Sequence, residues 1–165
     1  NKKYSCLRLK RMLQVVSLDL DVVKKKGMMK NVLVLCTGNS CRSQIAHGYL
    51  EHFSGENIKV FSAGVETHGV NPKAIETMNQ DGIDISEYTS NNIDEYGTQE
   101  FDYIITVCDN AKERCPYFPS NAVKFHQNFP DPPKFVGTDD EVRVEFARVR
   151  DLVKIYCKEF VAAYL

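Results

Sequence analysis

Short apolar segments alternate with amphipathic segments along most of the chain. Residues 32–35 are apolar without polar alternation, as expected for a parallel strand that is covered on both faces. The same pattern predicts strands at 59–61, 101–107 and 123–125, and helices at 42–53, from 72 to about 81, and at 140–165. Because helices separate the strands, we predict a single α/β domain with a four-stranded parallel sheet between two helical layers, a three-layer α/β/α architecture.

The composition fits a folded soluble domain and narrows the choice of partners. The 165 residues are 43% hydrophobic and 26% charged, richer in apolar residues than disordered chains are. The net charge of -1 gives no argument for binding to nucleic acid or to a membrane, and no apolar run approaches the roughly 20 residues of a membrane span. We therefore predict neither of these partners, and we expect a monomer.

Charge is distributed unevenly, because residues 1–28 hold eight Lys/Arg and two Asp, a net +6, and the remainder has a net -7. A basic N-terminal segment is compatible with a nucleic-acid arm or a targeting peptide. A secretory signal fits poorly, since Asp19 and Asp21 interrupt the best apolar stretch. We interpret residues 1–28 as a non-native or disordered leader with a native start at Met28 or Met29, and residues 29–165 as the domain.

Six cysteines occur at positions 6, 36, 41, 108, 115 and 157. The sequence has no C-x-x-C pair, and its four histidines show no repeated ligand spacing, so we predict no structural zinc or other metal site. Without a credible signal peptide, the cysteines are expected to be thiols in a reducing cytoplasm. A chemically active cysteine is then expected to be catalytic.

The segment after the first predicted strand has the form C-x5-R-S and precedes a predicted helix. In parallel sheets, sites lie at the carboxyl ends of the strands, which directs attention to this segment. A tight loop of small residues turns successive backbone N–H groups inward, and the positive end of the helix adds to the same field. Arg42 supplies a planar fork of donors for two oxygens of a tetrahedral oxyanion. We predict an oxyanion cradle made of Thr37, Gly38, Asn39, Ser40, Cys41 and Arg42.

The same field predicts a nucleophile at the start of this cradle. It stabilises a thiolate, so Cys36 is expected to have a depressed pKa and to be strongly nucleophilic at neutral pH. Ser43 is expected to donate a hydrogen bond to the thiolate, and Asn39 to brace the loop. The segment is not a nucleotide-binding P-loop, because the lysine of that motif is absent. The alternative is a strand-end cysteine and a surface arginine that meet by chance.

The segment CTGNSCRS at 36–43 resembles the phosphate loop of low-molecular-weight protein tyrosine phosphatases and of the arsenate reductases that share their fold. The resemblance extends over residues 29–165, includes the segment FSAG at 61–64, and implies the phosphatase-like fold. Gln44 favours the reductase branch, because phosphatases usually have Pro there. Cys108 and Cys115, seven residues apart, have the spacing of the thioredoxin-coupled arsenate reductases.

The reductase resemblance implies three further roles. Cys108 follows the third strand, which neighbours the first at about 4.8 Å, so its thiol is expected to reach an adduct on Cys36. Cys115 is then expected to accept the disulfide and pass it to thioredoxin. Asp131, in an Asp-Pro after the fourth strand, is the implied general acid. No metal or organic cofactor is implied, since the electrons come from thiols.

The spacing of the two resolving cysteines has a mechanical consequence. A helix over 108–115 would separate their thiols by about 10.5 Å along its axis, whereas a disulfide needs α-carbons within roughly 4.4–6.8 Å. We therefore predict that this segment unwinds near Pro116 and Pro119 when Cys108 and Cys115 bond.

The chain also departs from the family it resembles. Family members often carry Glu at the position of His47 and Asp at that of Asn91, and with Asn39 and Ser62 these residues can hold a potassium ion. Losing two carboxylates removes the charge that a cation site needs, so we predict no tight potassium site. Three cysteines are assigned no essential role: Cys6, Cys157 and Cys41, the last being structural and sensitive to oxidation.

Three functions are weighed. The leading one is a cytoplasmic arsenate reductase, with arsenate as the phosphate-like oxyanion and thioredoxin as the electron donor. The second is a low-molecular-weight tyrosine phosphatase that uses Cys36, Arg42 and Asp131 and leaves Cys108 and Cys115 idle. The third is a non-enzymatic oxyanion-binding or thiol-sensing protein, against which the acid and the resolving thiols count, because a binder needs neither.

Overall fold

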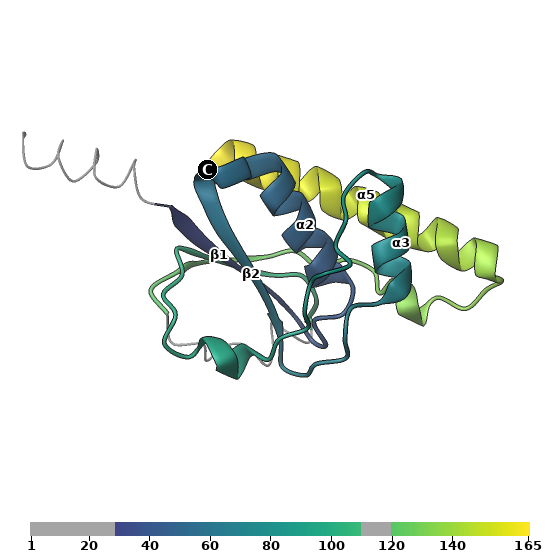
Figure 1. Cartoon of the computed structure of the whole chain (residues 1–165), viewed down its shortest axis with the longest axis horizontal. Coiled ribbons are helices and arrows are strands. Elements are labelled where there is room, and N and C mark those ends of the chain that lie inside the picture. Colours follow the sequence, from purple (N-terminus) through teal and green to yellow (C-terminus); the bar gives the residue numbers. More distant parts are fainter. Residues whose placement is uncertain (1–28, 110–119) are drawn as a thin grey trace, which may run out of the picture.

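A four-stranded parallel sheet forms the centre of the computed structural model, which describes residues 29–109 and 120–165. The strands are β1 Lys30–Cys36, β2 Ile58–Gly64, β3 Tyr103–Thr106 and β4 Val123–His126, in the order β2-β1-β3-β4. Figure 1 shows β1 and β2 side by side. Each neighbouring pair is parallel, which confirms the predicted sheet. The leader at 1–28 and Cys115, with the segment expected to unwind, lie outside the described residues.

The central strand β1 shows why an uninterrupted apolar run marks a strand of this kind. Val32 and Val34 belong to the core on one face of the sheet, and Leu33 and Leu35 belong to the core on the other. All four side chains are at most 2% exposed. The strand is longer than its apolar run, because backbone pairing with β2 extends over residues 30–36. Alternation between two buried faces therefore leaves no polar position in the middle of β1.

The described residues form three α-helices, α2 Arg42–Ser54, α3 Pro72–Gln80 and α5 Asp139–Tyr164. Of these, α3 and α5 carry local signals at their N-termini. The α3 helix begins with proline after Asn71, whose side chain accepts a hydrogen bond from the Lys73 N–H at 2.9 Å. Thr138 and Glu141 form a reciprocal capping box at the start of α5. None of the described helices is long and apolar enough to cross a membrane.

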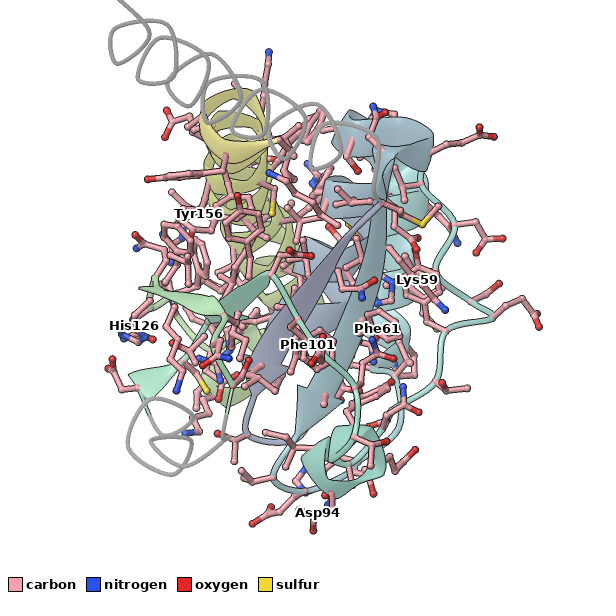
Figure 2. All side chains as sticks on the ribbon, turned by 90° about the vertical axis from the view of Figure 1, so that its left-hand side faces the viewer. Lys59, Phe61, Asp94, Phe101, His126 and Tyr156 are labelled. Atoms are coloured by element: carbon pink, nitrogen blue, oxygen red, sulfur yellow. The ribbon has the colours of Figure 1, made fainter. Side chains whose placement is uncertain are left out.

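The described elements form layers on the two faces of the sheet. Figure 1 shows α2, α3 and α5 together on one side, where the larger core contains Ile45, Tyr49 and Phe146. The other face is covered, in the described part, by the connection that holds the short 3-10 helix η2 Ile93–Tyr96. Phe61 and Phe101 pack there edge to face at 5.4 Å between ring centroids (Figure 2). Two further 3-10 turns are η1 Gly55–Asn57 and η3 Pro132–Lys134.

The sheet brings the segments with candidate chemistry to one edge. Because the strands are parallel, their carboxyl ends meet, and the register pairs Leu35 with Thr106 and Thr106 with His126. The residues that follow β1, β3 and β4 therefore start side by side. Those residues are the C-x5-R-S loop, Cys108 and the Asp-Pro segment.

Candidate active site

The loop 36–43 leaves β1 and enters α2 with its carbonyl groups turned outward. Each of four successive carbonyls accepts a hydrogen bond from outside the loop. The pairs are Thr37 O with Glu66 N at 2.9 Å, Gly38 O with His68 N at 3.1 Å, Asn39 O with Gln44 Nε2 at 2.9 Å and Ser40 O with Asn71 N at 2.9 Å. In a planar trans peptide the N–H points opposite to the carbonyl, so the N–H groups of residues 38–41 point toward the inside of the loop. This is the geometry that an oxyanion cradle requires.

The end of β2 packs directly against this loop, and only glycine fits there. A Cβ atom at Gly64 would lie 2.6 Å from the Thr37 carbonyl oxygen and 2.8 Å from the Asn39 nitrogen, and would also overlap the Glu66 carbonyl oxygen. All three are backbone atoms, which cannot swing aside as a side chain does. The absence of a side chain at Gly64 therefore sets how closely the sheet supports the cradle.

Asn39 braces the cradle from within the protein. The residue is fully buried and has a φ of 43°, in the left-handed region that Asn tolerates better than most residues. Its Oδ1 accepts a hydrogen bond from the Asn91 N–H at 2.8 Å, and its Nδ2 donates to Ser43 Oγ at 3.0 Å. The Ser43 oxygen acts as an acceptor in this bond, which does not use its hydroxyl hydrogen. The expected hydrogen bond from Ser43 to a thiolate at Cys36 stays a prediction.

Arg42 connects the loop to the segment that follows β4. Its Nη1 donates to the Phe129 carbonyl oxygen at 3.0 Å, and its Nη2 lies 3.2 Å from Asp131 Oδ1. Its Nε is buried and has no hydrogen-bond partner among the described residues. A buried guanidinium N–H without a partner is costly, and an oxyanion in the cradle would satisfy it.

Asp131 lies at the start of η3 and is half-buried. Lys134 Nζ lies 3.5 Å from its second oxygen, so two cations face the one carboxylate. The sequence pattern predicted the position of Asp131 after the fourth strand, but it did not predict the ion pair between Asp131 and Arg42. The structure thus brings the expected acid and the expected oxyanion fork into direct contact.

A second thiol lies against Cys36. Cys108 Sγ is 3.3 Å from Oγ1 of Thr37, the residue next to Cys36. The pKa of Cys36 is raised, first by its interaction with the Cys108 side chain and then by burial, whereas Arg42 and the Thr37 N–H lower it. The predicted depressed pKa is therefore wrong, because that prediction counted the cation and the amides but not the second thiol.

The other described cysteines are buried thiols. Burial is the main cause that raises the pKa of Cys41 to about 12, with Arg42 acting in the opposite direction. Cys157 lies in the core, where its Sγ is 3.7 Å from the Ala46 carbonyl oxygen and burial raises its pKa. Both are in the thiol form near neutral pH. Cys6 lies outside the described residues.

The positions compared with a potassium site lie together beneath the cradle. His47 Nδ1 is 3.1 Å from Ser62 Oγ, and His47 Nε2 is 3.2 Å from Glu51 Oε1. The His47 ring also lies on Tyr88, with centroids 4.5 Å apart. Within the described ranges, no group of three or more His, Cys, Asp or Glu residues is arranged to hold a metal ion.

Two residues of the site were not anticipated from the sequence. Gln44 donates to the Asn39 carbonyl and, at 2.9 Å, to the Thr89 carbonyl, so it supports the cradle from below. His68 lies so close to Gly38 that a Cβ there would be 2.8 Å from the His68 Nδ1. The glutamine that follows Arg-Ser was visible only as a marker of the family branch, and nothing in the pattern around His68 signalled its contact.

Known proteins match the chain over nearly all of its described length. The sequence profile of the family "Low molecular weight phosphotyrosine protein phosphatase" matches residues 31–164. An arsenate reductase of Halalkalibacterium halodurans is 47% identical over 131 residues, which cover 79% of this chain and 94% of that protein. The arsenate reductase of Bacillus subtilis is 44% identical with the same coverage, and one of Staphylococcus aureus is 46% identical over 79% of this chain and 95% of that protein.

Solved structures agree with these relatives. An arsenate reductase in the phosphate binding state superposes with a TM-score of 0.69 at 33% identity, over 81% of this chain and 98% of that one. A tyrosine phosphatase of Erwinia amylovora has a TM-score of 0.68 at 20% identity, over 82% of this chain and 93% of that one. The second likeness concerns the fold alone, which is the predicted phosphatase-like fold.

Proposed function

Since this chain belongs to the low molecular weight phosphotyrosine protein phosphatase family and is an arsenate reductase of that superfamily, we propose that it works by a three-cysteine relay regenerated by thioredoxin. The observation that carries the proposal is the position of the Cys108 thiol, whose Sγ is 3.3 Å from Oγ1 of Thr37, the residue next to Cys36, and which raises the pKa of the Cys36 thiol. Hydrolysis of a phosphate ester needs no second thiol, whereas reduction of arsenate needs a second thiol close to the nucleophilic cysteine.

Arsenate capture is the first step. The inward N–H groups of residues 38–41 and the unpartnered Nε of Arg42 bind the oxygens of arsenate. The Cys36 thiolate attacks arsenic, so that a sulfur–arsenic bond forms while one arsenic–oxygen bond breaks. Asp131 is the general acid that gives a proton to the departing oxygen, which leaves as water.

Electron transfer is the second step. The Cys108 thiolate attacks the sulfur of Cys36, and a sulfur–sulfur bond forms as the sulfur–arsenic bond breaks. The electron pair of the broken bond stays on arsenic, which is reduced from the +5 to the +3 state and leaves as arsenite. The two thiols are oxidised together by two electrons, so the step balances without a metal or organic cofactor.

Regeneration is the third step and involves a residue outside the described part of the chain. Cys115 attacks Cys108, which frees the Cys36 thiolate and leaves a Cys108–Cys115 disulfide. The dithiol of thioredoxin reduces that disulfide by exchange and becomes oxidised itself. We propose that the enzyme acts as a monomer in a reducing cytoplasm, which is consistent with the free thiols of Cys36, Cys41, Cys108 and Cys157.

A residual phosphatase activity is compatible with the same site. Cys36, Arg42 and Asp131 are the groups that hydrolysis of a small aryl phosphate requires, with water as the second nucleophile. The contact between Cys108 and Cys36 favours reduction as the main activity.

Serine variants test the relay through arsenite release with thioredoxin, thioredoxin reductase and NADPH. We expect Cys36→Ser to be inactive, Cys108→Ser to stop turnover while sparing any aryl phosphate hydrolysis, and Cys115→Ser to allow one turnover. Peptide mass mapping should then find a Cys36–Cys108 disulfide in Cys115→Ser. Wild-type turnover in both Cys108→Ser and Cys115→Ser would refute the relay and give first place to the phosphatase.

A further inference from the structure

The residue that directly follows Cys108 is held by two side chains from the neighbouring strand and its loop. Asp109 Oδ1 lies 3.2 Å from His126 Nε2, and Asp109 Oδ2 accepts a hydrogen bond from Asn128 Nδ2 at 2.6 Å. The Asp109 side chain is 63% exposed, yet each of its oxygens has a fixed partner. A carboxylate with a partner at each oxygen is held more firmly than one with a single partner, even where the side chain is exposed.

These partners are themselves anchored in the sheet. His126 ends β4, at the edge of the sheet (Figure 2), and its Nδ1 is 2.8 Å from Thr106 Oγ1 at the end of β3. The Gln127 N–H donates to the Thr106 carbonyl at 2.9 Å, so the start of the loop that carries Asn128 is also attached to β3. The contact with Asp109 is therefore backed by strand pairing.

The chain on the other side of Cys108 is fixed by its backbone. The Val107 N–H donates to the Leu35 carbonyl at 2.9 Å, and the Val107 carbonyl accepts from the Phe129 N–H at 3.4 Å. Cys108 thus lies between Val107, bound by its main chain, and Asp109, bound by its side chain. In the described part of the chain, the side-chain hydrogen bonds of Asp109, His126 and Asn128 are with one another and with Thr106, and the Asn128 carbonyl accepts a hydrogen bond from Gln127 Nε2; none of these bonds reaches the cradle at 36–43.

From this arrangement we propose that Asp109, His126 and Asn128 form a clamp that positions the Cys108 thiol for its attack on Cys36. The proposal rests on the proposed relay, of which it concerns only the second step. Displacement at sulfur requires the attacking thiolate to lie in line with the bond that breaks, and misplacement by about 1 Å can cost about 100-fold in rate. The clamp members are positioning residues, which touch neither arsenate nor the reacting sulfur atoms.

The test isolates the second step in the Cys115→Ser background, where the relay stops at the Cys36–Cys108 disulfide. The enzyme is mixed with arsenate, quenched with acid at set times, and assayed for this disulfide by peptide mass mapping. We expect Asp109→Ala and Asn128→Ala to slow its formation about tenfold, the factor that about 1.4 kcal/mol represents. Because Asp109→Ala already removes the contact that Asn128→Ala breaks, the double variant should be no slower than Asp109→Ala alone.

Three comparisons separate positioning from general damage. Affinity for inorganic phosphate, measured by calorimetry, should stay within about twofold of the parent, because the clamp does not touch the cradle. His126→Ala should slow disulfide formation, whereas His126→Gln, which keeps an N–H donor for Asp109, should form the disulfide at close to the parent rate. Asn121→Ala and His52→Ala, both at exposed positions away from the clamp, should match the parent.

The outcomes distinguish the clamp from the relay. Unchanged disulfide formation in Asp109→Ala and Asn128→Ala would overturn the clamp and leave the relay in place. A loss of phosphate affinity in parallel with the rate would also overturn it, since the variants would then have damaged the cradle. If the parent Cys115→Ser enzyme bound phosphate but formed no Cys36–Cys108 disulfide, the relay itself would fall and the clamp with it.

Discussion

At the scale of single residues, the proton on Cys36 is subject to opposing influences. Arg42 and the Thr37 N–H favour the thiolate, and the interaction with Cys108 together with burial favours the thiol. The second pair of influences prevails, so the pKa of Cys36 is raised. Cys108, the attacking thiol of the proposed relay, therefore also governs how readily Cys36 ionises.

Removing Cys108 should lower the pKa of Cys36, because the interaction with the Cys108 side chain is the largest cause that raises it. In Cys108→Ala the thiolate should persist to lower pH, so the alkylation of Cys36 by iodoacetamide should reach half its maximal rate at a lower pH than in the wild type. Cys157→Ala, a change at a buried thiol in the core, serves as the control and should not move the midpoint. A midpoint that stays or rises in Cys108→Ala would contradict this assignment.

Arg42→Lys should lower arsenate turnover by about 100-fold or more, as the loss of a preorganised oxyanion donor does in other enzymes. The guanidinium contacts the Phe129 carbonyl and Asp131 through two nitrogens and keeps a third, Nε, without a partner in the described part of the chain. The ammonium group of lysine cannot donate hydrogen bonds in three directions within one plane, as a guanidinium does. Arg148→Lys, at an exposed arginine paired with Glu145, is the matched control for steady-state arsenite release. Turnover within a few fold of the wild type in Arg42→Lys would exclude the assigned role.

At the scale of elements, the contact between the end of β2 and the cradle loop is set by Gly64. Gly64→Ala should destabilise the protein by about 1–3 kcal/mol, because its Cβ overlaps three backbone atoms. Relief of that overlap must move the loop, so phosphate affinity by calorimetry should fall together with the thermal midpoint. Gly97→Ala is the control, since a Cβ at Gly97 would lie 3.5 Å from the Asp94 carbonyl oxygen, an ordinary contact. Normal phosphate binding by Gly64→Ala would show that the loop tolerates the added atom.

The elements that the sequence predicted well are those whose signals are local. The unbroken apolar run of β1 and the Asn71-Pro72 start of α3 identify their elements without any distant partner. The third strand was predicted at 101–107 and is Tyr103–Thr106, because its limits depend on pairing with β1 and β4. Ends of strands are decided by neighbours, which a single segment does not reveal.

At the scale of the whole molecule, one polar contact joins the three helices on the same face of the sheet. Asp81, just after α3, accepts hydrogen bonds from Tyr49 of α2 at 2.6 Å and from Lys154 of α5 at 2.8 Å. These bonds, that of Lys154 first, lower the pKa of Asp81, so the folded protein favours its carboxylate. Carboxylates of this kind stabilise the fold above their ordinary pKa and lose that contribution as the pH falls through the lowered value.

Asp81→Asn should therefore lower the free energy of unfolding at pH 7 by about 2 kcal/mol, the scale of a hydrogen bond to a charged group. The difference from the wild type should shrink as the pH falls below about 4, where the wild-type carboxyl also becomes protonated. Urea unfolding at pH 7 and at low pH measures both. Asp140→Asn, at a side chain that is 94% exposed, should have little effect at either pH. An undiminished difference at low pH would rule out the charge as the cause.

The candidate site could be predicted in part, because its residues are recognisable but their contacts are not local. Cys36, Arg42 and Asp131 were identified from loop and turn patterns, and the structure places Arg42 against Asp131. The raised pKa of Cys36 was missed because it depends on an interaction between residues 72 positions apart in the sequence. The support of the cradle by segment 66–71 was missed because backbone hydrogen bonds leave no mark on side-chain composition.

The outward carbonyls of residues 37–40 have a consequence for selectivity. The inward backbone N–H groups recognise a ligand by its negative charge and its tetrahedral shape, and arsenate and phosphate share both properties. The cradle therefore binds phosphate as well as arsenate. Discrimination between them must come in the later step in which the electron pair of the broken sulfur–arsenic bond stays on arsenic, because phosphorus does not accept such a pair. Phosphate should then act as a competitive inhibitor that raises the KM for arsenate and leaves kcat unchanged. On this basis the ratio of the two anions, rather than enzyme concentration alone, sets the rate of arsenate reduction.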